Sequence, residues 1–135
     1  MLRLPQVAYA QMVALAYDEL PLEACGLIGG DPLTAKVDRF YPCRNEAESS
    51  KLYTVAGKDM LKADRDAEDR GFELIGVMHS HTHTDAYPSP TDVRQAIDPS
   101  WHYLIVSLKY DAPVLRSYRI VDGNITEEQV VLDDR

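Results

Sequence analysis

Helical and extended hydrophobic patterns alternate along this chain, and their order restricts the fold that it can adopt. Apolar residues recur at three- and four-residue steps from Leu4 to Leu20, which predicts a helix with Pro5 in its first turn. A second, more solvated helix is predicted from Lys58 to Arg70, ending at Gly71. Short apolar runs predict strands over residues 23–30, 36–43, 52–55, 73–78, 102–108, 114–121 and 125–132. Helices placed among strands in this way indicate a mixed α/β sheet.

The segments between these elements are polar. Residues 44–51 have no hydrophobic pattern and are predicted to form an exposed loop, and residues 82–88 form a loop before a short helix that begins near Ser89. The turn Asp122-Gly123-Asn124 joins the last two predicted strands as a hairpin. No repeat, low-complexity tract or linker interrupts the chain, so we expect one domain over residues 1–135.

Size and charge exclude several classes of protein. The chain has 135 residues, too few for a (β/α)₈ barrel, which needs about 250 residues. Its 14 basic and 22 acidic residues give a net charge of −8, which argues against nonspecific binding to nucleic acid or anionic lipid. No apolar stretch is long enough for a membrane span and no secretory leader is evident, so we expect the cytoplasm and reduced thiols at Cys25 and Cys43.

A histidine pair follows the buried strand that ends near residue 78. In an extended chain, His79 and His81 lie on one face with their Cα atoms about 6–7 Å apart, whereas Ser80 points to the other face. The two imidazoles are therefore close enough to bind one metal ion. A catalytic zinc site normally has three protein ligands, so one more donor is needed.

Asp92 is the candidate for this third ligand. The seven-residue loop after His81 is long enough to bring the first turn of the next helix back to the histidines, and Ser89 and Asp92 are neighbours on that turn. Ser89-Pro90-Thr91-Asp92 is also a typical helix start, with Ser89 as the N-cap and Asp92 near the positive end of the helix dipole. The sequence alone leaves the capping and metal-binding interpretations open.

Metal-assisted hydrolysis also needs a carboxylate that accepts a proton from the attacking water and gives it to the leaving amine. Glu23 stands at the head of a glycine-rich strand that can pack beside the histidine strand. It is therefore a candidate general base, although its position alone does not distinguish it from an ordinary exposed glutamate.

Taken together, these residues resemble the signature of the JAMM (MPN+) metallopeptidases: a distant Glu, then H-[ST]-H, seven residues, and S-x-x-D. Every element is present in order, and the similarity runs from about Glu23 to Ile97. It implies a JAMM/MPN fold related to that of cytidine deaminases, with a mostly antiparallel sheet flanked by helices. It also implies Zn²⁺ held by His79, His81 and Asp92, Glu23 as general base and acid, and Ser89 as hydrogen-bond donor to the oxyanion rather than as a cap.

Within the family, the chain is similar to the actinobacterial Mec peptidases. The similarity lies in the segments 79–82, 85–93 and 116–123. Those peptidases act on a ubiquitin-like sulfur carrier, CysO, whose C-terminal diglycine has been extended by cysteine. The resemblance therefore implies hydrolysis after Gly-Gly, release of cysteine, and a CysO-like carrier protein as partner.

Three other functions are weighed against this one. A nucleobase deaminase needs H-x-E and P-C-x-x-C, but His81 replaces the glutamate and Pro42-Cys43 has no second cysteine after it. A noncatalytic MPN interaction module lacks metal ligands, whereas the whole set is present here. A JAMM isopeptidase that removes a ubiquitin-like modifier from protein lysines remains open, although no long insertion is evident that would grip a second protein.

Four other residues are given no role in the chemistry. We expect His83 in the loop at the rim of the site, Asp85 as a loop carboxylate and His102 as a structural residue. Cys25 shares a strand face with Glu23 and is expected to be a small buried thiol.

Overall fold

The strand that carries the histidine motif lies inside a sheet. In the computed structural model, which describes residues 1–134, β4 (Glu73–His81) pairs with β2 (Cys25–Asp31) on one side and β5 (His102–Ser107) on the other. Residues 75–81 of β4 are all buried. Packed neighbours therefore fix where the strand ends, and with it the positions of His79 and His81.

Among the described residues, eight strands form one sheet in the order β7-β6-β5-β4-β2-β3-β1-β8. The remaining strands are β1 (Leu2–Pro5), β3 (Lys36–Cys43), β6 (Val114–Val121), β7 (Asn124–Glu128) and β8 (Val130–Asp133). Neighbours are antiparallel except for the parallel pairs β1–β3, β1–β8 and β4–β5. The predicted mixed α/β class, with a mostly antiparallel sheet, is confirmed.

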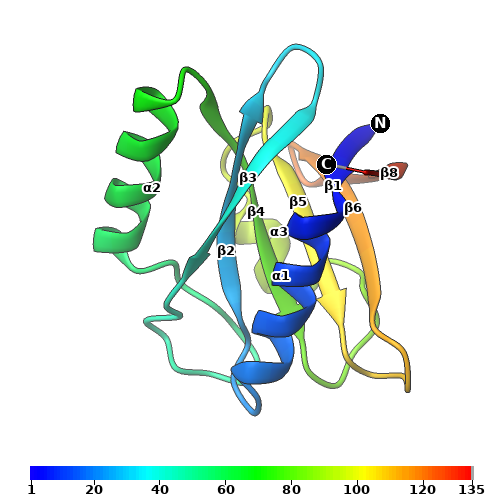
Figure 1. The fold of residues 1–135 in the computed structure, drawn as a ribbon. Helices are drawn as coiled ribbons and strands as arrows, with labels where there is room; N and C mark the ends of the chain where they lie inside the picture. Colours follow the sequence, from blue (N-terminus) through cyan, green and yellow to red (C-terminus); the bar gives the residue numbers. More distant parts are fainter. Residues whose placement is uncertain (135) are drawn as a thin grey trace.

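The helices pack on both faces of the sheet (Figure 1). On one face, α1 (Gln6–Asp18) buries Ala8, Met12 and Ala16 against a core that includes Met78. On the other face, Ala63 of α2 (Gly57–Asp69) and Val93 of α3 (Pro90–Gln95) pack against a second core. This second core contains Val77, which precedes His79 on the same face of β4.

The two edge strands of the sheet are consecutive in the chain. Strands β7 and β8 lie at opposite edges, yet only Gln129 separates them in the chain. The Gln129 carbonyl accepts a hydrogen bond from the Leu2 amide at 2.8 Å, where β8 begins to pair with β1. The predicted continuous strand over residues 125–132 is therefore wrong, because the chain changes partner at Gln129.

Two further predictions need correction. Residues 2–5 form strand β1, so the first helix begins at Gln6, after Pro5 rather than around it. Residues 52–55 form no strand, and the Asn45–Val55 bridge is their one ladder contact within residues 1–134. Asn45 is buried although the surrounding segment was expected to be exposed.

Cys25 and Cys43 are buried free thiols, as predicted. Within residues 1–134, no helix has the length and apolar character needed to cross a bilayer.

Candidate metal centre

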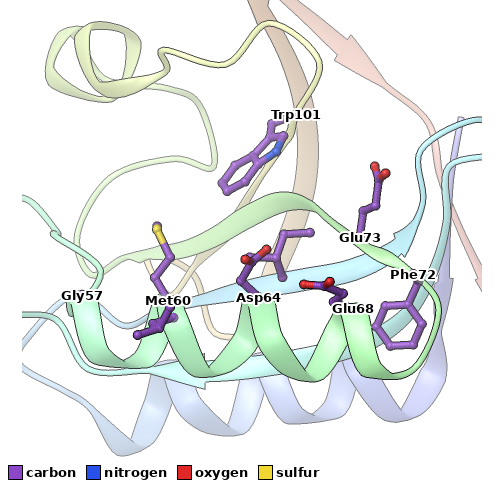
Figure 2. Close-up of a pocket in the computed structure, with 9 residues that line it drawn as sticks. Gly57, Met60, Asp64, Glu68, Phe72, Glu73 and Trp101 are labelled. Carbon is purple, nitrogen blue, oxygen red and sulfur yellow. The ribbon is translucent and has the colours of Figure 1, made fainter.

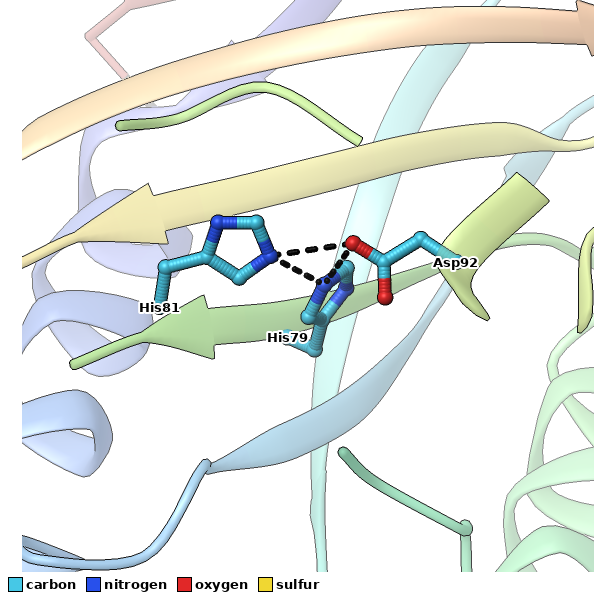
Figure 3. Close-up of side chains that lie close together, drawn as sticks. All are labelled: His79, His81 and Asp92. Carbon is cyan, nitrogen blue, oxygen red and sulfur yellow. Dashed lines mark hydrogen bonds and ion pairs between the residues drawn. The ribbon is translucent and has the colours of Figure 1, made fainter. Parts of the chain in front are cut away.

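Three buried side chains converge at the carboxyl end of β4 (Figure 3). The Nε2 atoms of His79 and His81 are 3.1 Å apart. The Oδ2 atom of Asp92, from the first turn of α3, lies 3.1 Å from His79 Nε2 and 3.0 Å from His81 Nε2. The strand therefore supplies two donor atoms, and the loop before α3 brings the third to them.

We call His79 Nε2, His81 Nε2 and Asp92 Oδ2 the donor triangle. The hydrogen bond at His81 Nδ1 indicates that a cation belongs between His81 and Asp92. His81 Nδ1 lies 2.7 Å from the carbonyl oxygen of Asp85. A carbonyl can only accept, so Nδ1 carries the proton and Nε2 of the neutral ring presents its lone pair. That lone pair faces a carboxylate oxygen at 3.0 Å, an arrangement that is unfavourable unless a cation, either a proton or a metal ion, lies between them.

The spacing of the donor atoms fits a tetrahedral metal site. Ligand bonds of 2.0–2.1 Å in a tetrahedron place neighbouring ligand atoms about 3.3 Å apart. The three separations of 3.0–3.1 Å are close to this value. Two imidazoles and one carboxylate are also a donor set that suits zinc.

Asp92 is fixed by the start of its own helix. Its Oδ2 accepts the Ser89 backbone N–H at 2.9 Å, and its own N–H donates to Ser89 Oγ at 3.1 Å, which together form a capping box. Ser89 therefore caps the helix, so the expectation that it does not act as a cap is wrong. Its expected role in catalysis stays a prediction. Capping and metal binding are compatible here, because the capping box orients the Asp92 carboxylate toward the histidines.

The protonation of the site follows from burial and from Asp92. Burial lowers the pKa of His79. Burial also opposes the charged form of His81, but the hydrogen bonds to Asp92 and to the Asp85 carbonyl raise its pKa above the usual value. Burial alone would raise the pKa of Asp92, but its hydrogen bonds to both histidines hold it well below the usual range, so the carboxylate is ionised.

Glu23 lies two residues before β2 begins at Cys25, and the neighbouring Ala24 is fixed beside β4. The adjacent Ala24 amide donates to Ser80 Oγ at 2.7 Å, and the Ser80 amide donates to the Ala24 carbonyl at 3.0 Å. Ser80 thus links the two strands instead of facing the histidines. The Glu23 side chain is 4% exposed, and burial raises its pKa to about 8, a shift that His81 partly offsets and Asp92 increases. In the metal-free protein, the pKa of this carboxyl group therefore lies well above its usual value and depends on the charges of His81 and Asp92.

The residues that were set aside lie outside the donor triangle. His83 is exposed in the loop after β4, and Asp85 accepts a hydrogen bond from Tyr110 at 2.7 Å. His102, the first residue of β5, makes a 2.6 Å contact with Glu128 at the end of β7. Cys25 is fully buried, with its Sγ 4.0 Å from the Cys43 carbonyl oxygen.

Sequence reasoning missed two residues beside the site. The ring of Tyr53 stacks on His79, with centroids 4.4 Å apart and planes at 18°. Asn45 donates a hydrogen bond to the Glu23 carbonyl at 3.0 Å. Asn45 lies in a segment without a hydrophobic pattern, where nothing in the local sequence marks a buried side chain. Tyr53 lies in the run predicted as a strand, and nothing in that run indicates that its ring stacks on His79.

An acidic groove lies on the face of the sheet covered by α2. Figure 2 shows it between α2, the start of β4 and Trp101. Its volume is about 740 Å³. Asp64, Glu68 and Glu73 line it, and its lining includes no Lys or Arg. An adjoining pocket shares Met60 and Trp101 with the groove and reaches Tyr53, the residue that stacks on His79.

The sequence of the chain is similar to those of known JAB-domain proteins and peptidases. Residues 5–121 match the family model described as prokaryotic homologs of the JAB domain. The chain is 42% identical over 120 residues to the CysO-cysteine peptidase of Mycobacterium tuberculosis, covering 88% of this chain and 82% of the relative. It is 32% identical over 88 residues to a desampylase of Haloferax volcanii, covering 64% of this chain and 63% of the relative.

Solved structures show the same fold. A protein of Desulfitobacterium hafniense superposes with a TM-score of 0.91 at 36% identity, covering 100% of this chain and 94% of that one. A JAB1/MPN domain protein of Archaeoglobus fulgidus superposes at 0.63 with 21% identity, covering 97% of this chain and 99% of that one. The predicted JAMM/MPN fold is confirmed.

Proposed function

The chain belongs to the family of prokaryotic JAB-domain proteins, and from this premise we propose that it is a zinc metallopeptidase acting on a ubiquitin-like sulfur-carrier protein. It hydrolyses the bond after the carrier's C-terminal diglycine and releases cysteine. The observation that carries the proposal is the buried cluster of His79 Nε2, His81 Nε2 and Asp92 Oδ2, three side-chain atoms close enough together to bind one metal ion. The similarity to CysO-cysteine peptidases supports the substrate class.

His79, His81 and Asp92 hold the metal in this proposal. When bound, zinc acts as a Lewis acid that polarises the scissile carbonyl and makes water a stronger nucleophile at neutral pH. The ionised state of Asp92 supplies one negative charge to offset the charge of the ion.

Glu23 moves the proton. Its carboxylate accepts a proton from the attacking water as the new C–O bond forms, and then donates that proton to the amine nitrogen as the C–N bond breaks. A pKa raised to about 8 in the metal-free protein, and lowered by any cation bound beside it, is suited to both steps.

Ser89 stabilises the negative charge that develops on the carbonyl oxygen. Its Oγ accepts the Asp92 amide proton, which leaves the hydroxyl proton available to donate. A donor preorganised at this position contributes about 3 kcal/mol to transition-state stabilisation.

The reaction is tested by mass spectrometry of a carrier protein that ends in Gly-Gly-Cys. Incubation with the zinc-loaded enzyme is expected to yield the carrier ending in Gly-Gly together with free cysteine, and Glu23→Gln is expected to leave the adduct intact. Persistence of the adduct with active-site residues and metal in place would contradict the proposal.

The second candidate is an isopeptidase that removes a ubiquitin-like modifier from protein lysines, which the similarity to a desampylase supports. It predicts the reverse preference: a carrier joined to a lysine side chain is cleaved and the Gly-Gly-Cys adduct is not. The third candidate, a noncatalytic MPN module, predicts that neither conjugate is cleaved.

We further propose that the protein acts in the cytoplasm, where the thiols of Cys25 and Cys43 stay reduced.

A further inference from the structure

Two buried polar atoms at the site have no hydrogen-bond partner within residues 1–134. They are Glu23 Oε1 and His79 Nδ1. His81, in contrast, is oriented by its Nδ1–H bond to the Asp85 carbonyl. A base and a metal ligand must be held within a narrow range of positions to be effective, so some other contact has to orient Glu23 and His79.

Glu23 is held through its backbone. Its N–H donates to the Ser49 carbonyl at 2.8 Å, and its carbonyl accepts Asn45 Nδ2 at 3.0 Å. Both partners belong to the segment 45–55, which we call the Asn45 loop. Because this loop binds the backbone of Glu23 on both sides, it limits where the side chain can point.

His79 is held by its ring. Tyr53, also in the Asn45 loop, stacks on the imidazole with an interplanar angle of 18°, and its own side chain is 9% exposed. This stacking limits the rotation of the His79 ring, which no hydrogen bond at Nδ1 limits. One loop therefore supports both side chains that have an atom without a hydrogen-bond partner.

Asn45 holds this loop together. Besides Glu23, its Nδ2 donates to the Leu52 carbonyl at 3.1 Å and more distantly to the Ser49 carbonyl at 3.5 Å. Its Oδ1 accepts the amides of Ala47 at 3.0 Å and Thr54 at 2.9 Å. The residue is 7% exposed, and a side chain that satisfies so many backbone groups in the interior is costly to replace.

We propose that Asn45 is a positioning residue for the hydrolysis: through the Asn45 loop it holds the Glu23 backbone in place and keeps Tyr53 stacked on His79. The catalytic consequence rests on the proposed function. The loop contacts themselves do not depend on it.

The first test uses Asn45→Asp, which keeps the size and the Oδ1 acceptor but turns an oxygen toward the carbonyls of Glu23 and Leu52. Asn124→Asp is the matched control, because it makes the same chemical change at an exposed residue of β7. At saturating zinc, Asn45→Asp is expected to lower kcat by about 10-fold or more, within the range that misplacing a catalytic group costs, with little change in KM. Asn124→Asp is expected to match the wild type. A kcat within twofold of wild type for Asn45→Asp, or a change confined to KM, would overturn the proposal.

The second test needs no catalysis and no substituted Asn45. In NMR spectra of the metal-free wild-type protein, the Asn45 side-chain amide protons are expected to exchange slowly. The ring protons of His79 are expected to carry a ring-current shift that Tyr53→Leu removes and Tyr53→Phe keeps. Fast exchange at Asn45, or no ring-current shift at His79, would overturn the proposal even if the enzyme is active.

These two tests separate the inference from the proposed function. A wild-type protein that cleaves no carrier but shows the expected NMR signals refutes the proposed function and leaves the loop contacts established. A wild-type enzyme that is active but lacks those signals refutes the role of Asn45 alone.

Discussion

Ser89 and Asp92 carry a structural and a chemical role in the same four residues. The capping box begins α3 and also orients the Asp92 carboxylate toward His79 and His81. A substitution at Ser89 therefore removes the side-chain cap and the oxyanion contact together. Glycine still keeps most of the helix stability, because it is tolerated at the N-cap position.

We predict that Ser89→Gly separates the two roles. Its free energy of unfolding is expected to fall by only a few tenths of a kcal/mol, whereas Ser89→Ala is expected to lose about 1 kcal/mol. Both variants are expected to lose about 100-fold or more in kcat, because both lack the hydroxyl donor. Denaturant unfolding and steady-state kinetics measure the two effects, and a Ser89→Gly enzyme of wild-type kcat would exclude the hydroxyl from catalysis.

Glu23 gives a pH-dependent signature in the metal-free protein. Its pKa is raised from 4.5 to about 8 on folding, so the folded state prefers the protonated carboxyl. The stability from this group is fully present below pH 4.5 and is lost as the pH rises toward 8, because the unfolded chain ionises first. Glu23→Gln, which stays neutral, is therefore expected to be more stable than wild type at pH 8 relative to its stability at pH 4.

Urea unfolding of both proteins in the presence of a chelator measures this difference at the two pH values. A difference between wild type and Glu23→Gln that does not depend on pH would show that the carboxyl group is not buried as described.

At the scale of elements, close packing of β4 against β5 positions the histidines. A Cβ atom at Gly76 would lie 2.2 Å from the backbone oxygen of His102, so the two strands can approach as they do only with glycine there. This contact is at the start of the β4–β5 pairing, three residues before His79.

Gly76→Ala is predicted to push β4 away from β5. We expect a loss of about 1–3 kcal/mol in the free energy of unfolding, as for other overpacked sites. Gly57→Ala is the control, since a Cβ atom there meets nothing within 4 Å. Thermal or urea denaturation of the two variants tests this, and equal stabilities would contradict the packing argument.

The elements that the sequence predicted well are those with local signals. The apolar run before His79, the helix-start motif at Ser89 and the His–Ser–His alternation all lie within a few residues, and each placed its side chains correctly. The Asn45 loop and the switch of strand partner at Gln129 depend on contacts with residues far along the chain, here Glu23 and Leu2. Residues 52–55 have strand-like composition, but Tyr53 packs on His79 instead of joining a ladder.

At the scale of the whole molecule, the acidic charge bears on which partner can approach. The net charge is −8, and the groove beside α2 is lined by Asp64, Glu68 and Glu73. Such a surface attracts a carrier protein with a basic face and repels an acidic one.

We therefore predict that KM for the carrier rises with salt. Between low ionic strength and 0.15 M or more, where the screening length falls to about 8 Å, KM is expected to increase several-fold while kcat stays nearly constant. Charge reversal in the groove, as in Glu68→Lys, is expected to reduce the salt dependence. A KM that is independent of salt would contradict electrostatic attraction by this surface.

The central claim is that one metal ion binds between His79, His81 and Asp92. Anomalous diffraction from crystals of zinc-replete protein, recorded on both sides of the zinc absorption edge, tests it directly. We predict one strong zinc peak within about 2.0–2.2 Å of His79 Nε2, His81 Nε2 and an Asp92 carboxylate oxygen. The absence of a peak there, or a peak only at the His102–Glu128 pair, would contradict the account.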